Sequence, residues 1–423
     1  RTLKSQSRVR YMEASATAGS SRDWSELPTD LVVSILGRLT ADDYVRFGAV
    51  CKEWYSVTKA RLCPPATRIP WLLFPATGDG GDDGAATHRL FDLSTNKSYK
   101  MTLREISGRQ CIGNSADGRW VVYIGHDMEL RMLNLNTRQQ VGLPPLATLW
   151  NIKNVTYDAS GRPVEYDVQI NHHRALLTVD YLLQYFYHKV IVFSAGSPPD
   201  GPLSVAFVHG PSQTVSVARV GDEAWTRFDY PYGVTDFVFH QGRLCAVDFL
   251  GNTVAWTMLD PATFSWSDAR RLGSPIDDPN IYQKYLVPLT RGSDDVFQVW
   301  RDVRNINHPI SGLALNHRTF LVKVLKLDRA EDSWVEVNNL GGHTFFLGYN
   351  YSIVLSADEI GHFRGNCIYF TDDDMEKMVR DAEVRHRDRD TGVFNLEDGS
   401  WEPLPIPNGV VNFPSPIWVT PLF

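Results

Sequence analysis

The most regular pattern of hydrophobic positions lies near the start of the chain, within residues 24–62. Leu31, Ile35 and Leu39 recur at four-residue spacing, which places one apolar stripe along a helix. Pro28 stands at the beginning of this stripe, where the first turn of a helix tolerates a residue without an N–H group. The pattern therefore predicts an amphipathic helix that begins near Pro28.

Two further helices are expected in the same segment. Thr40 predicts a helix start because its hydroxyl can cap the first turn, and Asp43 can reach back to complete the cap. Trp54 and Val57 lie in a third helical stretch. We therefore expect a small all-α unit of three helices at residues 23–63. A unit this small is expected to need a neighbour or a partner for secure stability.

Beyond Pro64 and Pro65, short apolar runs alternate with Gly, Asp and Asn turns. An apolar strand end followed by Asp or Asn and a short turn recurs at Asp92, Asn134, Asp260, Asp328 and Asn395. The first two of these positions are 42 residues apart, and the next gap is three times as long. The last three are followed by Trp266, Trp334 and Trp401. Asp or Asn at such a turn bonds the backbone two residues on, and Trp can pack between adjacent sheets.

Periods of about 40–50 residues with four strands each are typical of propeller blades. The pattern therefore predicts an all-β domain at residues 66–423, a β-propeller of six or seven blades. The run Ile417–Val419 is expected to pair as a late strand of this domain. A pair of irregular β-sandwiches joined by ordinary hairpins is the alternative. Residues 1–22 are too polar to form a core and are expected to be a flexible tail.

Composition and charge narrow the class of partner. Hydrophobic residues make up 43% of the chain and charged residues 22%, which indicates a folded protein in water. The net charge of −7 disfavours a nucleic-acid partner, because phosphate binding needs a concentrated basic surface. The five cysteines form no C-x-x-C pair, so neither a disulfide framework nor a zinc site is predicted. No apolar run is long enough for a membrane helix, and we expect a reducing compartment, the cytoplasm or the nucleus.

The usual catalytic motifs are missing. We find no phosphate loop, dinucleotide loop, nucleophile elbow or metalloprotease helix, so we predict no catalytic residue, cofactor or metal. The triplet His386-Arg387-Asp388 imitates a kinase catalytic loop, but Val393 stands where that loop needs Asn. We interpret the surrounding stretch, Asp372–Asp390, as a solvated loop between blade strands, and we expect it to be mobile near Glu376–Asp390.

Two other groups of residues could bind a metal or a ligand, but each also has an ordinary structural explanation. Asp79, Asp82 and Asp83 lie among glycines, but the ligand spacing of a calcium loop is missing, so a mobile insertion is favoured. His172 and His173, close in sequence to several aromatic residues, could line a metal or ligand pocket. A histidine pair at a strand edge beside a buried aromatic cluster is the commoner outcome.

The segment from Leu27 to Ser56, LPTDLVVSILGRLTADDYVRFGAVCKEWYS, resembles the F-box over the whole of that motif. Tyr44 stands where Leu is usual. The rest of the chain resembles a plant family in which an F-box precedes a β-propeller-like domain of unknown function. The segments that carry this resemblance are Ala224–Phe228, Phe239–Gly251, Trp334–Gly348, Gly365–Asp373 and Gly392–Leu404.

The resemblance implies a substrate-recognition subunit of a Skp–cullin–F-box ubiquitin ligase, without an active site of its own. Its partners would be a Skp-type adaptor, a cullin bound through the adaptor, and a protein substrate held by the β domain. The F-box residues expected to bind the adaptor are Leu27, Pro28, Leu31, Ile35, Leu36, Leu39, Val50, Cys51 and Trp54. Independently, a three-helix unit with this many apolar residues can bury the surplus only against another protein.

Two other functions stay open at this stage. The first is a stoichiometric inhibitor or scaffold of a partner such as a kinase, with the F-box adding only localisation. The second is an enzyme whose propeller axis holds a ligand, which the fold permits although no site is visible in the sequence.

Overall fold

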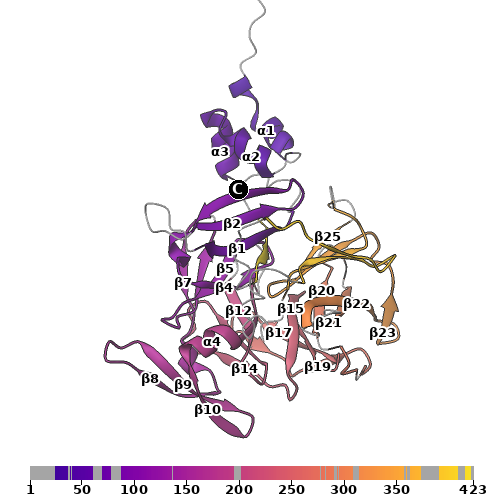
Figure 1. Ribbon diagram of the computed structural model, residues 1–423. Coiled ribbons are helices and arrows are strands. Elements are labelled where there is room, and N and C mark those ends of the chain that lie inside the picture. The colour runs from indigo at the N-terminus through magenta and orange to yellow at the C-terminus, as the bar shows by residue number, and fades with distance from the viewer. Residues whose placement is uncertain are drawn as a thin grey trace, which may run out of the picture. The chain divides into compact units, whose positions relative to one another are not determined.

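The computed structural model describes most of the chain, which divides into two compact units, Arg1–Ala66 and Thr67–Phe423 (Figure 1). The described residues are 24–36, 39, 41–60, 69–77, 87–135, 137–194, 202–276, 278–281, 283–289, 293, 295–307, 314–356, 359, 363–372, 390–407 and 415–420. The predicted tail, the glycine-rich segment with Asp79 and most of the charged stretch with His386 lie outside them. The cap predicted at Thr40 lies outside them too.

The first unit is helical, as predicted. It consists of η1 (Trp24–Glu26), α1 (Thr29–Leu36), α2 (Ala41–Gly48) and α3 (Lys52–Ala60). The carbonyl of Pro28 accepts from the N–H groups of Leu31 and Val32, so the proline does open the first helix. The core of the unit is small and consists of Val32, Leu36, Tyr44, Phe47 and Val57. None of the described helices is long and apolar enough to cross a membrane.

The second unit, the β unit, is built from consecutive groups of strands. The first group orders β29 (Ile417–Val419), β1 (Trp71–Thr77), β2 (Thr87–Asp92) and β3 (Lys97–Thr102). The second orders β4 (Gln110–Ser115), β5 (Trp120–Ile124), β6 (Arg131–Asn134) and β7 (Gln140–Gly142). The third orders β11 (Tyr187–Ser194), β12 (Leu203–His209), β13 (Thr214–Arg219) and β14 (Thr226–Phe228). β11 pairs in parallel with β4, so the second and third groups form one eight-stranded sheet.

The chain then adds three more groups. The fourth orders β15 (Val234–His240), β16 (Arg243–Asp248), β17 (Thr253–Asp260) and β18 (Ser265–Trp266), with β19 (Arg270–Leu272) also on β17. The fifth orders β20 (Gln283–Pro288), β21 (Val296–Asn307), β22 (Ala314–Asp328) and β23 (Ser333–Val337). The sixth orders β25 (Ile353–Leu355), β24 (Thr344–Leu347), β26 (Cys367–Phe370), β27 (Gly392–Asn395) and β28 (Trp401–Pro403). The described residues therefore form a propeller arrangement, and the predicted number of blades stays a prediction.

One segment leaves this succession between the second and third groups. It holds η3 (Leu146–Thr148), a three-stranded sheet in the order β10 (His173–Thr178), β9 (Pro163–Ile170), β8 (Ile152–Tyr157), and α4 (Val179–Tyr185). The sheet extends away from the neighbouring strands of the β unit (Figure 1). This excursion and the third group both lie between Asn134 and Asp260, the interval that is three times the first spacing of the repeated turn.

The chain's last strand closes the β unit on its first. β29 pairs antiparallel with β1, and Leu72 lies opposite Trp418. The predicted pairing of Ile417–Val419 is therefore confirmed. Closing the succession with a strand from the far end of the chain removes the open inner edge that a linear row of sheets would leave.

The repeated turn has the predicted role. Each of the five Asp or Asn residues ends the next-to-last strand in the order given for its group, and its side chain accepts from the turn that follows. The acceptors and first donors are Asp92 with Ser94 N at 2.9 Å, Asn134 with Thr137 N at 3.0 Å, Asp260 with Ala262 N at 2.9 Å, Asp328 with Ala330 N at 2.9 Å and Asn395 with Glu397 N at 2.9 Å. Trp334, from the fifth group, donates its indole N–H to the carbonyl of Leu272 in the fourth at 3.2 Å, which confirms packing between sheets.

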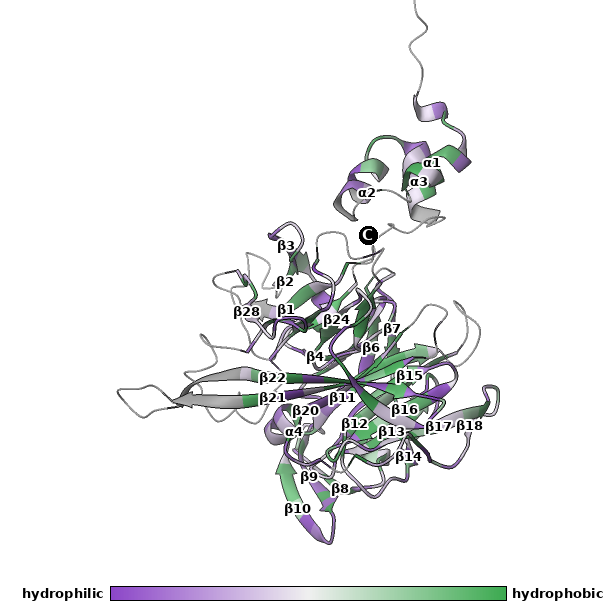
Figure 2. Ribbon diagram, turned by 90° about the vertical axis from the view of Figure 1, so that its right-hand side faces the viewer, coloured by the Kyte–Doolittle hydropathy of each residue, from purple (hydrophilic) through white to green (hydrophobic). Residues whose placement is uncertain are grey.

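The inner strands are apolar without alternation because both of their faces are buried. In β11, Val190 and Val192 pack in the cluster shared with the second group, whereas Ile191 and Phe193 pack in the cluster shared with the fourth. Further clusters join the fourth group to the fifth, the fifth to the sixth and the sixth to the first. Figure 2 shows the apolar residues concentrated in these strands.

Removal of residues 413–423 should abolish soluble expression of the chain. The deletion removes β29, so the inner edge of β1 and the groups that bond Trp418 lose their partners together. Expression yield and a calorimetric melt of the purified product measure the outcome. A soluble truncated protein with a single cooperative melting transition would contradict the closed arrangement.

Candidate functional site

The helical unit exposes an apolar ridge along its first helix. Leu31 is 48% exposed and Ile35 37%, and their spacing of four residues puts them on one face of α1. Pro28, three residues before Leu31, is exposed as well. We call Pro28, Leu31 and Ile35 the α1 ridge. Val50, in the turn between α2 and α3, is 63% exposed and adds a further apolar side chain to the surface of the unit.

The other predicted adaptor-binding residues lie deeper. Leu27, Leu39, Cys51 and Trp54 are half-buried, and all but Cys51 pack against the core. The ring of Trp54 stacks on Phe47 with 4.1 Å between ring centroids, so only part of it is available to a partner. Leu36 is fully buried in the core of the unit. Its methyl groups fill that core and do not form part of the unit's surface.

A buried hydrogen-bond network lies where the first and last strands of the β unit meet. The backbone carbonyl of Trp418 accepts from the side-chain amides of Asn114 on β4, at 2.8 Å, and Asn350, at 2.6 Å. The Trp418 N–H donates to the side-chain oxygen of Asn350 at 3.2 Å, and the Asn114 oxygen accepts from Tyr351 N at 3.1 Å. Tyr351 then donates its hydroxyl to the carbonyl of Phe239 on β15 at 3.1 Å. Four groups of the β unit are thus tied together.

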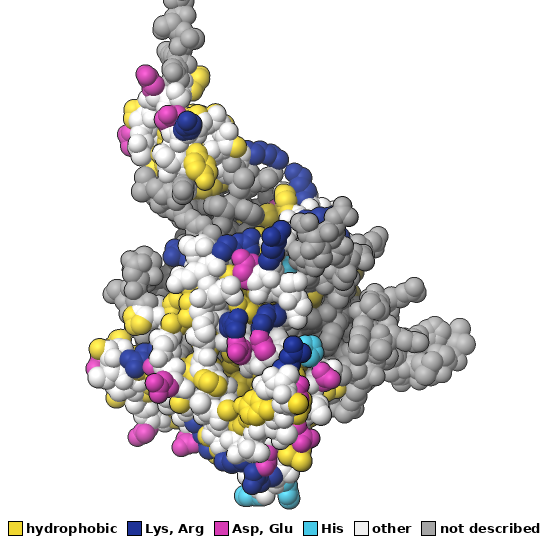
Figure 3. All heavy atoms as spheres, turned by 90° about the vertical axis from the view of Figure 1, so that its left-hand side faces the viewer, with side chains coloured by type: hydrophobic (Ala, Val, Ile, Leu, Met, Phe, Trp, Pro, Cys, Tyr) yellow, Lys and Arg dark blue, Asp and Glu magenta, His cyan; other side chains and the backbone are white. Residues whose placement is uncertain are grey.

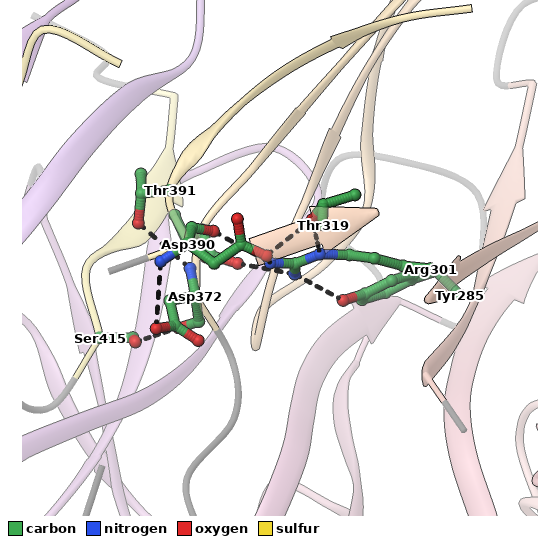
Figure 4. Close-up of polar contacts among 8 residues, drawn as sticks. Tyr285, Arg301, Thr319, Asp372, Asp390, Thr391 and Ser415 are labelled. Atoms are coloured by element: carbon green, nitrogen blue, oxygen red, sulfur yellow. Dashed lines mark hydrogen bonds and ion pairs between the residues drawn. The ribbon is translucent and has the colours of Figure 1, made fainter. Parts of the chain in front are cut away.

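A buried ion pair joins the fifth group to the sixth (Figure 4). Arg301 on β21 and Asp390, just before β27, are 3% and 0% exposed, and their charged atoms lie 2.7 Å apart. Arg301 also donates to Thr319 at 2.8 Å and to Tyr285 at 3.2 Å, and its guanidinium lies over the ring of Phe370. Every member therefore has a partner, as a buried charge requires.

The same cluster corrects an interpretation made from the sequence. Asp372 and Asp390, the two ends of the stretch interpreted as a solvated loop, are 8% and 0% exposed. The N–H of Asp390 donates to the Asp372 carboxylate at 3.3 Å, and Ser415 donates to the Asp372 carbonyl (Figure 4). The interpretation is wrong at both ends. Arg301, 89 residues away, compensates the charge of Asp390. Asp372 is buried and accepts from Asp390 N–H and from Ser415. Residues 373–389 lie outside the described part.

A second buried ion pair joins three groups. Lys189 on β11 and Asp236 on β15 contact each other and are 3% and 1% exposed. The Asp236 carboxylate also accepts from the N–H of Leu286 on β20 at 2.7 Å and from Phe237 N at 2.8 Å. Burial raises the pKa of Asp236, while Lys189 and these N–H groups oppose the rise. The third, fourth and fifth groups share this contact.

The histidine pair predicted beside aromatic residues lies in the open. His172 and His173 are exposed at the turn between β9 and β10, whereas Phe186 and Tyr187 are buried. The structure thus separates the pair from the buried aromatic residues. Among the described residues, no three His, Cys, Asp or Glu side chains are placed to hold a metal ion.

A small cavity lies where β4, β11 and β29 come together. Its lining consists of Gln110, Cys111, Ile112, Tyr187, Tyr349, Ser415 and Ile417. Burial raises the pKa of the Cys111 thiol to about 12 and raises that of Tyr187 as well, so both stay protonated near neutral pH. The lining therefore offers neither a thiolate nor a charged acid–base pair to a bound molecule.

Two known families match separate parts of the chain. A family described as F-box-like matches residues 24–62, and one described as KIB1-4 beta-propeller matches residues 90–395. The chain belongs to the KIB1-4 beta-propeller family. The resemblance to F-box proteins that carry a propeller is thereby confirmed, and the KIB1-4 propeller corresponds to the β unit.

Relatives of this KIB1-4 protein cover nearly all of its length. The F-box protein SKIP23 of Arabidopsis thaliana is 26% identical over 94% of this chain and 96% of its own. The probable F-box protein At4g22165 of the same plant is 23% identical over 90% and 91% of the two chains. Among solved structures, the RRP9 WD40 repeats are similar over 61% of this chain and 63% of theirs, at 10% identity and a TM-score of 0.29. A likeness this distant carries no argument here.

Replacing Asp390 by Asn should lower the free energy of unfolding of the KIB1-4 propeller by about 3–5 kcal/mol, because Arg301 is left charged and buried. Chemical denaturation measures the change. Arg364→Met is the matched control, since its pair with Glu402 is half-exposed and should contribute about 1 kcal/mol or less. Equal losses in the two variants would contradict the assigned role of the buried pair.

His209 should make the KIB1-4 propeller less stable in acid. It is fully buried, and burial lowers its pKa to about 3, whereas the unfolded chain takes up the proton near pH 6.5. This stability is complete above about pH 6.5 and is lost as the pH falls, by about 2 kcal/mol at pH 5. Chemical denaturation at pH 7.5 and 5 should show a smaller loss in His209→Gln than in the natural chain. The exposed His172→Gln should behave as the natural chain does, and an unchanged loss in His209→Gln would refute the assignment.

Proposed function

We propose that this protein is the substrate-recognition subunit of a Skp–cullin–F-box ubiquitin ligase. The observation that carries the proposal is the α1 ridge, which the helical unit leaves exposed although its own core is small. In this role the helical unit docks a Skp-type adaptor, the cullin joins through the adaptor, and the KIB1-4 propeller holds a protein substrate.

The chemistry of the ridge suits a helical partner. Leu31 and Ile35 are branched aliphatic side chains on one helix face, and such residues bind by filling the grooves between a partner's side chains. Leu27, Leu39 and Trp54 are half-buried beside the core, so each can contribute its remaining exposed surface. Leu36 supports them from within, because it fixes α1 against the rest of the unit.

The propeller's part in this proposal is recognition and not catalysis. Its buried charges, Arg301 with Asp390 and Lys189 with Asp236, are engaged by neighbouring strands. These contacts give a rigid frame with outward-facing loops, which is how such scaffolds commonly present binding residues. Ubiquitin transfer would be done by the bound partners.

A stoichiometric inhibitor or scaffold differs from this role in what happens to the bound partner. A ligase subunit lowers the abundance of its substrate, so that abundance should rise when the proteasome is blocked. An inhibitor leaves the abundance of its partner unchanged. The ridge favours the ligase role because a propeller that only blocks a partner needs no adaptor surface.

Replacing Leu31 and Ile35 together by Ala should weaken binding to a purified Skp-type adaptor by about 100-fold or more. The change removes six aliphatic carbon atoms, at about 0.8 kcal/mol for each one buried in the interface. Isothermal titration of the full chain with the adaptor gives the affinity, and a thermal melt tests the fold. Leu259→Ala is the matched control, because Leu259 is 64% exposed on β17 of the other unit. Unchanged adaptor affinity in the folded double variant would refute the ligase proposal.

A further inference from the structure

Three strands of six residues lie at the outer edge of a sheet in the described part of the β unit: β3, β8 and β10. They differ in the features that keep an edge strand from pairing with another chain. β3 carries Lys97 and Lys100. β8 has two register breaks in its pairing with β9 and carries Lys153. Lysines and bulges of this kind keep an edge strand from pairing with another chain. The third such edge, β10, has neither feature.

The pairing of β10 with β9 is regular along its whole length. All six residues from His173 to Thr178 pair in continuous register, without a bulge, a proline or a lysine. Arg174 is the only Lys, Arg, Asp or Glu residue of the strand, and it donates to Asp167 on β9 through Nε at 2.9 Å and through a second nitrogen. Its charge is therefore directed to the sheet's own next strand, and it leaves the outer edge open.

The hairpin fixes which backbone groups lie on that edge. Asn171 and His172 form a two-residue turn, so Ile170 and His173 are a hydrogen-bonded pair that closes it. Bonding then alternates along the strand, and the N–H and C=O groups of Arg174 and Leu176 point away from β9. No backbone hydrogen bond from another described element reaches these groups.

Side chains along β10 favour a particular kind of segment. Leu176 is 64% exposed and lies between Arg174 and Thr178 on one face of the sheet. His172 and His173 are exposed at the start of the strand, and the two-residue turn holds no acidic side chain. Histidine, Lys and Arg side chains lie at the lower end of the face shown in Figure 3, where this excursion lies, with Asp and Glu side chains among them. A complementary strand would cover Leu176 with an apolar side chain and place a carboxylate near the histidines.

We propose that the outer edge of β10 receives an extended segment of the substrate protein as an added strand, with an apolar residue against Leu176 and an acidic residue near His172 and His173. The inference rests on the proposed role as a substrate receptor and specifies where the substrate is held. Backbone hydrogen bonds to Arg174 and Leu176 supply the affinity, and the two side-chain contacts supply the selectivity.

Two variants at one position separate backbone from side-chain effects. Leu176→Pro removes the outward N–H and replaces the leucine side chain by a smaller ring, and an edge strand tolerates proline where the N–H faces solvent. Leu176→Thr removes the same apolar side chain and keeps the N–H. The two variants differ chiefly in the donor that strand addition requires.

The test uses the full chain and a displayed library of short random peptides. Selected peptides should alternate in pattern, with an apolar and an acidic residue, and should slow hydrogen exchange at the amides of Arg174 and Leu176. Leu176→Pro should weaken the best selected peptide by about tenfold or more relative to Leu176→Thr, since only the former lacks the donor. A thermal melt should show both variants folded.

Other outcomes overturn the proposal. Equal binding by the two folded variants, or selected peptides that leave the β10 amides unprotected, would exclude strand addition at this edge, and so would a library that yields no binder. A concentration-dependent dimer that Leu176→Pro abolishes would assign the edge to a second copy of the chain. If Leu176→Pro alone unfolds, hydrogen exchange with the natural chain decides the matter. Adaptor binding is measured separately, so failure at β10 leaves the ligase proposal standing, and loss of the ligase proposal leaves the peptide result intact.

Discussion

The β unit depends on how the backbone of Trp418 is bonded. β29 is only three residues long, yet its pairing with β1 joins the last group of strands in the β unit to the first. Asn350 donates to the Trp418 carbonyl and accepts from the Trp418 N–H, so its side-chain amide imitates a residue of a neighbouring strand. Only an amide has a donor and an acceptor so placed, because a carboxylate has no donor. The short closing strand is thus bonded on both sides, by β1 and by this amide.

The other contacts between groups are of two kinds: a close backbone pairing between β4 and β11, and buried ion pairs between the later groups. Gly113 lies where β4 and β11 pair in parallel, and a Cβ atom there would come within 2.3 Å of the Val190 carbonyl oxygen. Asp236 and Arg301 connect the later groups, because each also bonds partners from a neighbouring group: Asp236 bonds Lys189 and Leu286, and Arg301 bonds Asp390. A substitution at one of these contacts should therefore also strain the next contact, because one sheet of a closed arrangement cannot shift without moving its neighbours. Closure is the requirement that these contacts share, and the outer strands take no part in it.

Sequence patterns predicted the parts of this structure that are local. The spacing of Leu31 and Ile35 places a helix face, and Asp92 or Asp328 marks a turn because its side chain bonds only a few residues ahead. The pairing of Arg301 with Asp390 spans 89 residues, and nothing near Asp390 in the sequence signals it. The burial of Leu36 beside the exposed Ile35 likewise depends on where α2 and α3 pack. The excursion with β8, β9 and β10 was hidden because its length, together with the third group, fits a multiple of the repeat.

The two candidate surfaces share a physical cause. In each, a small element has potential contacts that its own packing cannot satisfy: apolar side chains on α1, and backbone donors and acceptors on β10. The propeller body differs, because closure pairs the backbone groups of its inner strands and buries their apolar side chains. A receptor needs this contrast, since a rigid body keeps the added contacts in place while the open elements supply them. Affinity at α1 comes from removing apolar area from water, whereas at β10 it comes from hydrogen bonds that water otherwise makes. Binding at α1 should therefore tolerate many apolar partners of fitting shape, and binding at β10 should require an extended backbone first and particular side chains second.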